Sequence, residues 1–191
     1  MKKIVAFVTC LVLPATALAG DWYAFLEGGF GWSFDRSNQD EVEFGDEPGG
    51  NLAIGGGARF QLDEHWRINV EGQALGQVIP LHGRNDKREA SADGRYLWLA
   101  GLTANAWPEY ALSERWSLYA GGGLGPGVIG AFGASAVTLV AVGGLGVRFQ
   151  ATDALALDFA GRYYWTLPAS LDGARSEYDT LGPAFRLSYF F

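Results

Sequence analysis

The residue types best suited to catalysis in this chain are its two histidines. His82 precedes Asp86 and Ser91 in one polar stretch, so a base, an acid and a nucleophile occur close together in the sequence. Their spacing matches no known catalytic triad, and a histidine among several basic residues is typical of a solvated loop. His65 lies in a short polar segment, where a solvated turn is the simplest interpretation. We predict that the protein is not an enzyme, and His82 keeps catalysis open as the weaker alternative.

Acidic residues in the segment 33–50 are the first candidates for a metal site. Carboxylates are calcium ligands, but these lack the ordered spacing of a calcium-binding loop, so we interpret the segment as solvated. Two histidines and one cysteine, Cys10, argue against a transition-metal site. The glycine-rich stretches precede no predicted helix and match no nucleotide motif. We predict no metal and no cofactor, although weak cation binding by this segment stays open. The acidic residues are Asp40, Glu41, Glu43, Asp46 and Glu47.

Other charged residues occur singly inside segments that alternate apolar residues with small or polar ones. They are Glu27, Arg59, Glu71, Arg148, Asp158, Arg162 and Arg186. If these segments are neighbouring strands of a barrel, the charges at mid-height alternate in sign from strand to strand. Buried charges need partners, so the pattern predicts an ion-pair network that fills a narrow lumen. A charge-lined pore or proton path is the alternative.

The elements that must position these charges are eight segments with period-two alternation. Because a strand points successive side chains to opposite faces, each segment has one continuous apolar face. Each is about ten or more residues long, which is the length of a tilted membrane strand. The segments cover residues 22–32, 51–62, 66–79, 95–106, 116–125, 136–150, 155–166 and 180–191.

The connections between these segments alternate between long and short. The long ones are 33–50, 80–94, 126–135 and 167–179, and the short ones include 107–115. This asymmetry is typical of membrane barrels, and a soluble barrel would instead bury its apolar face. We therefore predict an all-β fold, an eight-stranded antiparallel transmembrane β-barrel with up-and-down meander order.

Tryptophans lie near the ends of the predicted strands. Trp22, Trp66, Trp107 and Trp116 fall at one end, and Trp32, Trp98 and Trp165 fall near the other. Aromatic side chains at both membrane interfaces form such girdles in membrane barrels. The tryptophans thus agree with the barrel prediction.

The N-terminal segment, residues 1–19, has the pattern of a cleaved secretory signal. Lys2 and Lys3 precede a short apolar run, and Ala17-Leu18-Ala19 forms a small-residue cleavage site. The apolar run is too short to cross a bilayer as a helix. The remaining residues, 20–191, are predicted to form one barrel domain without cysteine. Without the two lysines, 12 basic residues face 21 acidic ones, a net charge of −9 that argues against a nucleic-acid partner.

The last strand ends on alternating apolar residues, Phe185, Leu187, Tyr189 and Phe191. This ending resembles the C-terminal signal that the assembly machinery of bacterial outer-membrane β-barrels reads. Further resemblance rests on Trp22-Tyr23, residues 53–60 (AIGGGARF), residues 119–127 (YAGGGLGPG) and residues 161–164 (GRYY). Together these motifs resemble the eight-stranded outer-membrane β-barrel superfamily, which includes OmpA-like and opacity-type surface proteins.

The resemblance implies a location in the outer membrane of a Gram-negative bacterium and a structural or adhesive role. The implied partners are outer-membrane lipid and lipopolysaccharide, the barrel assembly machinery with periplasmic chaperones, and a host or cell-surface ligand at loops 33–50, 80–94 and 167–179. A narrow ion or small-solute channel is the first alternative. A lipid A-modifying enzyme is the second. The lipid A deacylase family carries His-x-Ser at the outer end of its penultimate strand, whereas residues 162–166 here (RYYWT) contain neither.

Overall fold

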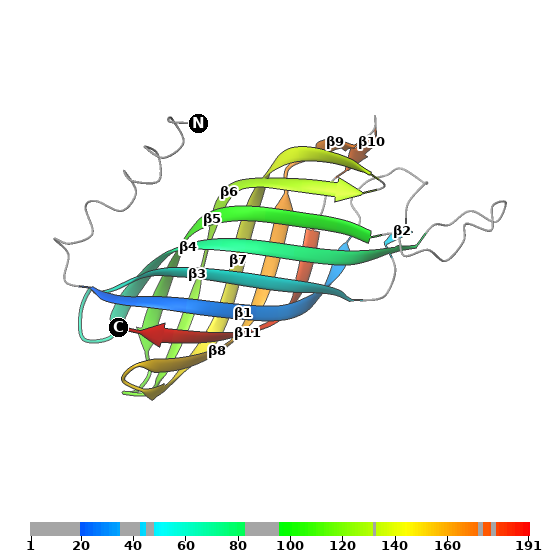
Figure 1. Ribbon diagram of the computed structural model, residues 1–191. Coiled ribbons are helices and arrows are strands. Elements are labelled where there is room, and N and C mark those ends of the chain that lie inside the picture. Colours follow the sequence, from blue (N-terminus) through cyan, green and yellow to red (C-terminus); the bar gives the residue numbers. More distant parts are fainter. Residues whose placement is uncertain are drawn as a thin grey trace, which may run out of the picture.

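The computed structural model describes residues 20–34, 43–44, 48–82, 96–131, 133–171, 174–176 and 179–191, which form a closed β-barrel (Figure 1). Its wall consists of eight long strands. They are β1 (Asp21–Phe34), β3 (Gly49–Gln61), β4 (Trp66–His82), β5 (Tyr96–Ala111), β6 (Trp116–Ala131), β7 (Ala134–Thr152), β8 (Leu155–Thr166) and β11 (Asp179–Phe190). Three short strands add to them: β2 (Glu43–Phe44) pairs with β4, and β9 (Ala169–Leu171) pairs with β10 (Ala174–Ser176).

Every pairing in the wall is antiparallel, and each strand lies beside its neighbour in the chain order. The barrel closes where β1 meets β11, with Leu26 opposite Leu187 (Figure 1). The predicted fold class, an eight-stranded antiparallel meander barrel, is confirmed. None of the described residues belongs to a helix long and apolar enough to cross a membrane.

The two faces of the wall separate as the period-two pattern predicts. Along β11, for example, Phe185 and Leu187 are exposed on the outside, while Arg186 and Ser188 are buried inside. The outside therefore carries a band of exposed apolar side chains, and much of the polar chemistry is enclosed. This arrangement is the reverse of a soluble barrel and suits a wall surrounded by lipid.

The two ends of the barrel differ in their connections. Residues 62–65, 112–115 and 153–154 form tight turns at one end, which we call the turn end, and the opposite end is the loop end. At the turn end, Asp63 accepts hydrogen bonds on its Oδ1 from the backbone N–H groups of His65 and Trp66, both 2.8 Å long. The predicted loops 33–50 and 167–179 contain the short strands β2, β9 and β10.

The prediction of a long loop over residues 126–135 is wrong. Strand β6 continues through Pro126 to Ala131, which pairs directly with Ala134 of β7. Pro126 has no N–H to donate, and the β5–β6 pairing steps across it from Gly101–Gly127 to Ala104–Leu124. Gly133 adopts a positive φ of 85°, which glycine reaches without strain, and this allows the tight turn.

The turn predicted over residues 107–115 is present but starts later than expected, at residue 112. Strand β5 continues to Ala111, and the period-two alternation continues with it. As a result, Trp107 lies inside the barrel with 2% of its surface exposed, and it is not part of a girdle. Glu109 is likewise buried inside.

Towards the loop end the lumen contains an apolar zone beside buried polar residues such as Gln77 and Thr180, and towards the turn end it is charged. The apolar zone contains the buried side chains of Ile79, Leu97, Leu99, Ile129, Val140 and Val142. Ala169 of β9 belongs to the same cluster, so this short strand helps to cover the loop end. The charged zone lies below and contains the candidate functional residues.

Candidate functional site

Arg186 occupies the centre of the charged zone, between two carboxylates. Its Nε atom lies 2.8 Å from Glu27 Oε2, and its Nη1 and Nη2 atoms lie 2.7 and 3.1 Å from the two carboxylate oxygens of Glu71. Arg162 adds a second guanidinium to Glu27, with Nη2 2.8 Å from Oε2. These four charges come from β11, β1, β4 and β8, so they connect opposite parts of the wall.

Neutral donors complete the coordination of Glu71. Its carboxylate accepts hydrogen bonds from the Tyr23 hydroxyl at 2.9 Å and from the Trp107 indole N–H at 2.8 Å. The Asn105 amide lies farther away, at 3.4 Å. Because a buried charge is stable only when it is paired and hydrogen-bonded, these donors help to hold a carboxylate that is 3% exposed.

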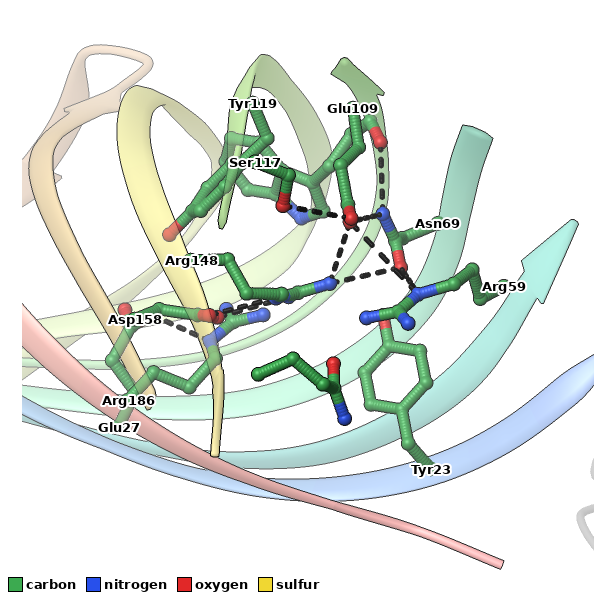
Figure 2. Close-up of polar contacts among 12 residues, drawn as sticks. Tyr23, Glu27, Arg59, Asn69, Glu109, Ser117, Tyr119, Arg148, Asp158 and Arg186 are labelled. Atoms are coloured by element: carbon green, nitrogen blue, oxygen red, sulfur yellow. Dashed lines mark hydrogen bonds and ion pairs between the residues drawn. The ribbon is translucent and has the colours of Figure 1, made fainter. Parts of the chain in front are cut away.

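Arg148 organises a second group of charges (Figure 2). It forms a bidentate pair with Asp158, with distances of 2.7 Å from Nε and 2.9 Å from Nη2. Its Nη1 atom reaches Glu109 Oε2 at 2.7 Å. Glu109 also accepts hydrogen bonds from the Asn69 amide at 2.8 Å and the Ser117 hydroxyl at 2.9 Å.

Aromatic rings support the arginines from the side. The Arg186 Cζ atom lies 3.8 Å from the centroid of the Phe25 ring, and Arg162 Cζ lies 4.4 Å from that of Trp107. Cation–π contacts of this kind are strongest where water is excluded. The rings of Phe25 and Trp107 therefore fill space in the lumen and also stabilise the positive charges of Arg186 and Arg162.

All seven charged residues singled out in the sequence lie inside the barrel with at most 8% of their surface exposed. Their partners differ from the expected lateral order. Glu71 pairs across the lumen with Arg186, and the carboxylate nearest to Arg59 is that of Glu109, at 3.9 Å. A guanidinium on a long side chain can span an eight-stranded barrel, which is only wide enough for side chains to fill.

Glu109 is the residue that the sequence reasoning missed. Its carboxylate forms ion pairs with Arg148 and, at 3.4 Å, with Arg67, which lies closer to the turn end. The signal was present, because Trp107, Glu109 and Ala111 continue the alternation of the preceding strand. A turn that starts at residue 107, as predicted, would leave Glu109 outside the strand.

A cavity of about 10 Å³ lies among Gln77, Tyr164, Thr180 and nearby glycines. That volume is about enough for one water molecule. The cavity beside Tyr164 and Thr180 is therefore too small to form a channel.

Five of the tryptophans assigned to the girdles, Trp22, Trp32, Trp66, Trp98 and Trp116, are exposed on the outer wall, and Trp165 is half-buried. The terminal residues Phe185, Leu187, Tyr189 and Phe191 are also exposed outside. The Phe191 N–H donates to the carbonyl of Trp22 at 2.9 Å, which holds the chain end against β1. Recognition of this ending by assembly machinery stays a prediction.

The two histidines and the acidic segment considered for catalysis and metal binding are not part of the buried charged zone. His65 is exposed at the turn end, with its ring centroid 5.8 Å from that of Tyr110. His82 is the last residue of β4, whereas Asp86 and Ser91 lie outside the described residues. Within the part of the chain that the structure describes, no three His, Cys, Asp or Glu side chains are grouped to hold a metal ion. Most of the acidic segment and the predicted signal, residues 1–19, also lie outside it.

Comparisons with known proteins agree with this geometry. A family model described as "Outer membrane protein beta-barrel domain" matches residues 4–191. Neisserial surface protein A is 14% identical, with a TM-score of 0.57 over 89% of this chain and 97% of that one. The outer membrane enzyme PagL is 10% identical, with a TM-score of 0.53 over 85% of this chain and 97% of that one. At these identities the likeness shows the fold alone, and among curated proteins no sequence matches.

Proposed function

We propose that this chain, which belongs to the outer membrane protein β-barrel domain family, is a closed barrel that acts through its outer surface. The protein is located in the outer membrane of a Gram-negative bacterium. Within that location, we assign it a non-enzymatic role in surface structure or adhesion. Lipid and lipopolysaccharide surround the wall, and the connections at the loop end provide the contact surface.

The observation that carries this proposal is the position of Arg186 between Glu27 and Glu71. A guanidinium that bridges two carboxylates across the lumen occupies the path that a solute would take. The apolar side chains of the loop-end zone fill the next part of that path. With the interior occupied, the exposed wall and the loops remain as the places for interaction.

The similar fold of Neisserial surface protein A supports a surface role, because that protein is named for its location. We propose residues 33–50, 80–94 and 167–179 as the contact regions for a host or cell-surface ligand. The β6–β7 connection is a tight turn and offers little surface for such contacts. We also propose that the barrel assembly machinery and periplasmic chaperones receive the chain before it reaches the membrane.

Adhesion by bacteria that display the full-length protein tests this role. Cells with the protein should bind epithelial or bacterial surfaces more strongly than cells without it. Replacing residues 33–42 by a short glycine-serine linker should reduce binding, whereas Glu64→Gln at the turn end should leave it unchanged. Equal binding by cells with and without the protein would contradict the adhesive role, and equal binding by the two variants, at equal amounts of folded protein, would contradict a contact through residues 33–42.

A narrow anion channel is the second candidate, and one observation favours it. Arg59 Nη2 and Arg162 Nη1 are buried and have no hydrogen-bond partner among the described residues. In a planar bilayer the closed barrel should be silent. A steady open level whose anion preference falls in Arg59→Gln would instead establish the channel.

A further inference from the structure

The outer wall contains a hollow between β3, β4 and β5, close to the loop end. Its volume is about 470 Å³, and Leu52, Val78 and Trp98 stand at its sides. This volume falls in the range of small-molecule sites, roughly 300–1,000 Å³. The hollow opens outwards, into the region that lipid occupies.

Two glycines form the floor of the hollow. Gly50 lies opposite Val78, and Gly76 lies opposite Leu52. A Cβ atom added to Gly50 would meet no heavy atom within 4 Å, and one added to Gly76 would meet only the Leu99 carbonyl oxygen, at 3.9 Å. The hollow therefore exists because glycine has no side chain at these two positions, and no described residue packs into it.

The orientation of Trp98 keeps the hollow open. A Cβ atom added to Gly130 on β6 would lie 2.5 Å from Cε2 and Cζ2 of Trp98, so the indole covers this glycine. Strand β6 lies on the side of β5 that faces away from β4. The indole thus leans away from Gly76, and the space above the glycine floor stays free.

We propose that this hollow binds one acyl chain of lipid A, the membrane anchor of lipopolysaccharide. The hollow is continuous with the exposed apolar band that forms the membrane interface, where Leu52 is 59% and Val78 48% exposed. A hydrocarbon chain matches this setting, since the outward-facing side chains are apolar and an empty hollow would lose dispersion contacts.

The choice of lipid A follows from the position of the hollow in the membrane. Long loops face outwards in outer-membrane barrels, so the loop end lies in the outer leaflet, where lipopolysaccharide is the main lipid. This binding depends on the membrane location alone. It does not require that the loops contact a partner.

Native mass spectrometry of the full-length protein tests the site. The protein is expressed in a Gram-negative host and extracted with a mild detergent, and retained lipids are identified by mass. The wild-type protein should keep one lipopolysaccharide molecule. Gly76→Leu and Gly50→Leu, which fill the hollow from different strands, should each lose it.

Gly161→Leu is the matched control, because Gly161 is exposed on the outer wall of β8 and a Cβ atom there meets nothing within 4 Å. It should keep the lipid. Heat-modifiable gel migration verifies that each variant is folded. Retention of phospholipid in place of lipopolysaccharide, equal retention by folded Leu variants, or no retention by the wild type would each overturn the proposal.

Discussion

Arg186 and Glu71 are 115 residues apart in the sequence, yet they form a bidentate ion pair across the lumen, at 2.7 and 3.1 Å. The pair joins the last strand of the barrel to its third wall strand, which is not its neighbour. Around the wall, β4 and β11 are linked through β3, β1 and the β1–β11 pairing that closes the barrel. The charged zone is therefore coupled to closure of the wall as well as to filling of the lumen.

Glu71→Gln should destabilise the folded barrel by about 3 kcal/mol, because it leaves Arg186 with one buried carboxylate instead of two. The amide keeps the shape of the side chain, but its single oxygen can accept a hydrogen bond from only one of Tyr23 and Trp107, which donate to different carboxylate oxygens of Glu71. Unfolding by urea in lipid vesicles, followed by tryptophan fluorescence, measures the change. Glu64→Gln, at an exposed turn residue, controls for loss of one negative charge. Equal stability of both variants would contradict a structural role for the network.

The second group of charges should show energetic coupling between Arg148 and Glu109. Their atoms lie 2.7 Å apart, and both side chains are nearly fully buried. Each single change, Arg148→Met or Glu109→Gln, removes the shortest ion-pair contact between the two groups and leaves the other residue with fewer partners. The double variant should therefore lose less stability than the two single losses combined, by about 1–3 kcal/mol. Additive losses in the same urea assay would show that the pair does not act as a unit.

Much of this structure could be predicted from alternation alone. Residues 155–166 form β8 as expected, because no proline or glycine cluster interrupts the pattern there. The predicted strand ends were wrong near Pro126 and Pro108, because proline often ends a strand but lies within β6 and β5 here. Alternation assigns a face to each residue, which is why the seven charges were placed inside. It does not determine which charges meet across the lumen, since that depends on side-chain length and barrel width.

Alanine substitution at two nearby glycines of the barrel wall should differ in its effect on the stability of the folded barrel. At Gly55 a Cβ atom would meet the Gly72 carbonyl oxygen and lie 2.6 Å from the Phe25 ring, whereas at Gly72 it would meet nothing within 4 Å. Gly55→Ala should therefore cost about 1–3 kcal/mol through overpacking, and Gly72→Ala should be close to neutral. Urea unfolding of the two variants provides the comparison. A larger loss for Gly72→Ala would show that the inward face tolerates added volume.

The stability that Asp63 confers on its turn should depend on pH in the acid range. Backbone N–H groups of His65 and Trp66 donate to its carboxylate and lower the pKa from the ordinary value of 3.8. Because the folded pKa is lower than the unfolded one, the contribution is complete above pH 3.8 and is lost as the pH falls through the folded pKa. Asp63→Ala lacks this contribution at every pH. The difference in urea midpoint between wild type and Asp63→Ala should thus be constant near neutral pH and shrink below about pH 4. A difference that stays constant down to pH 2 would show that the ionised carboxylate does not hold the turn.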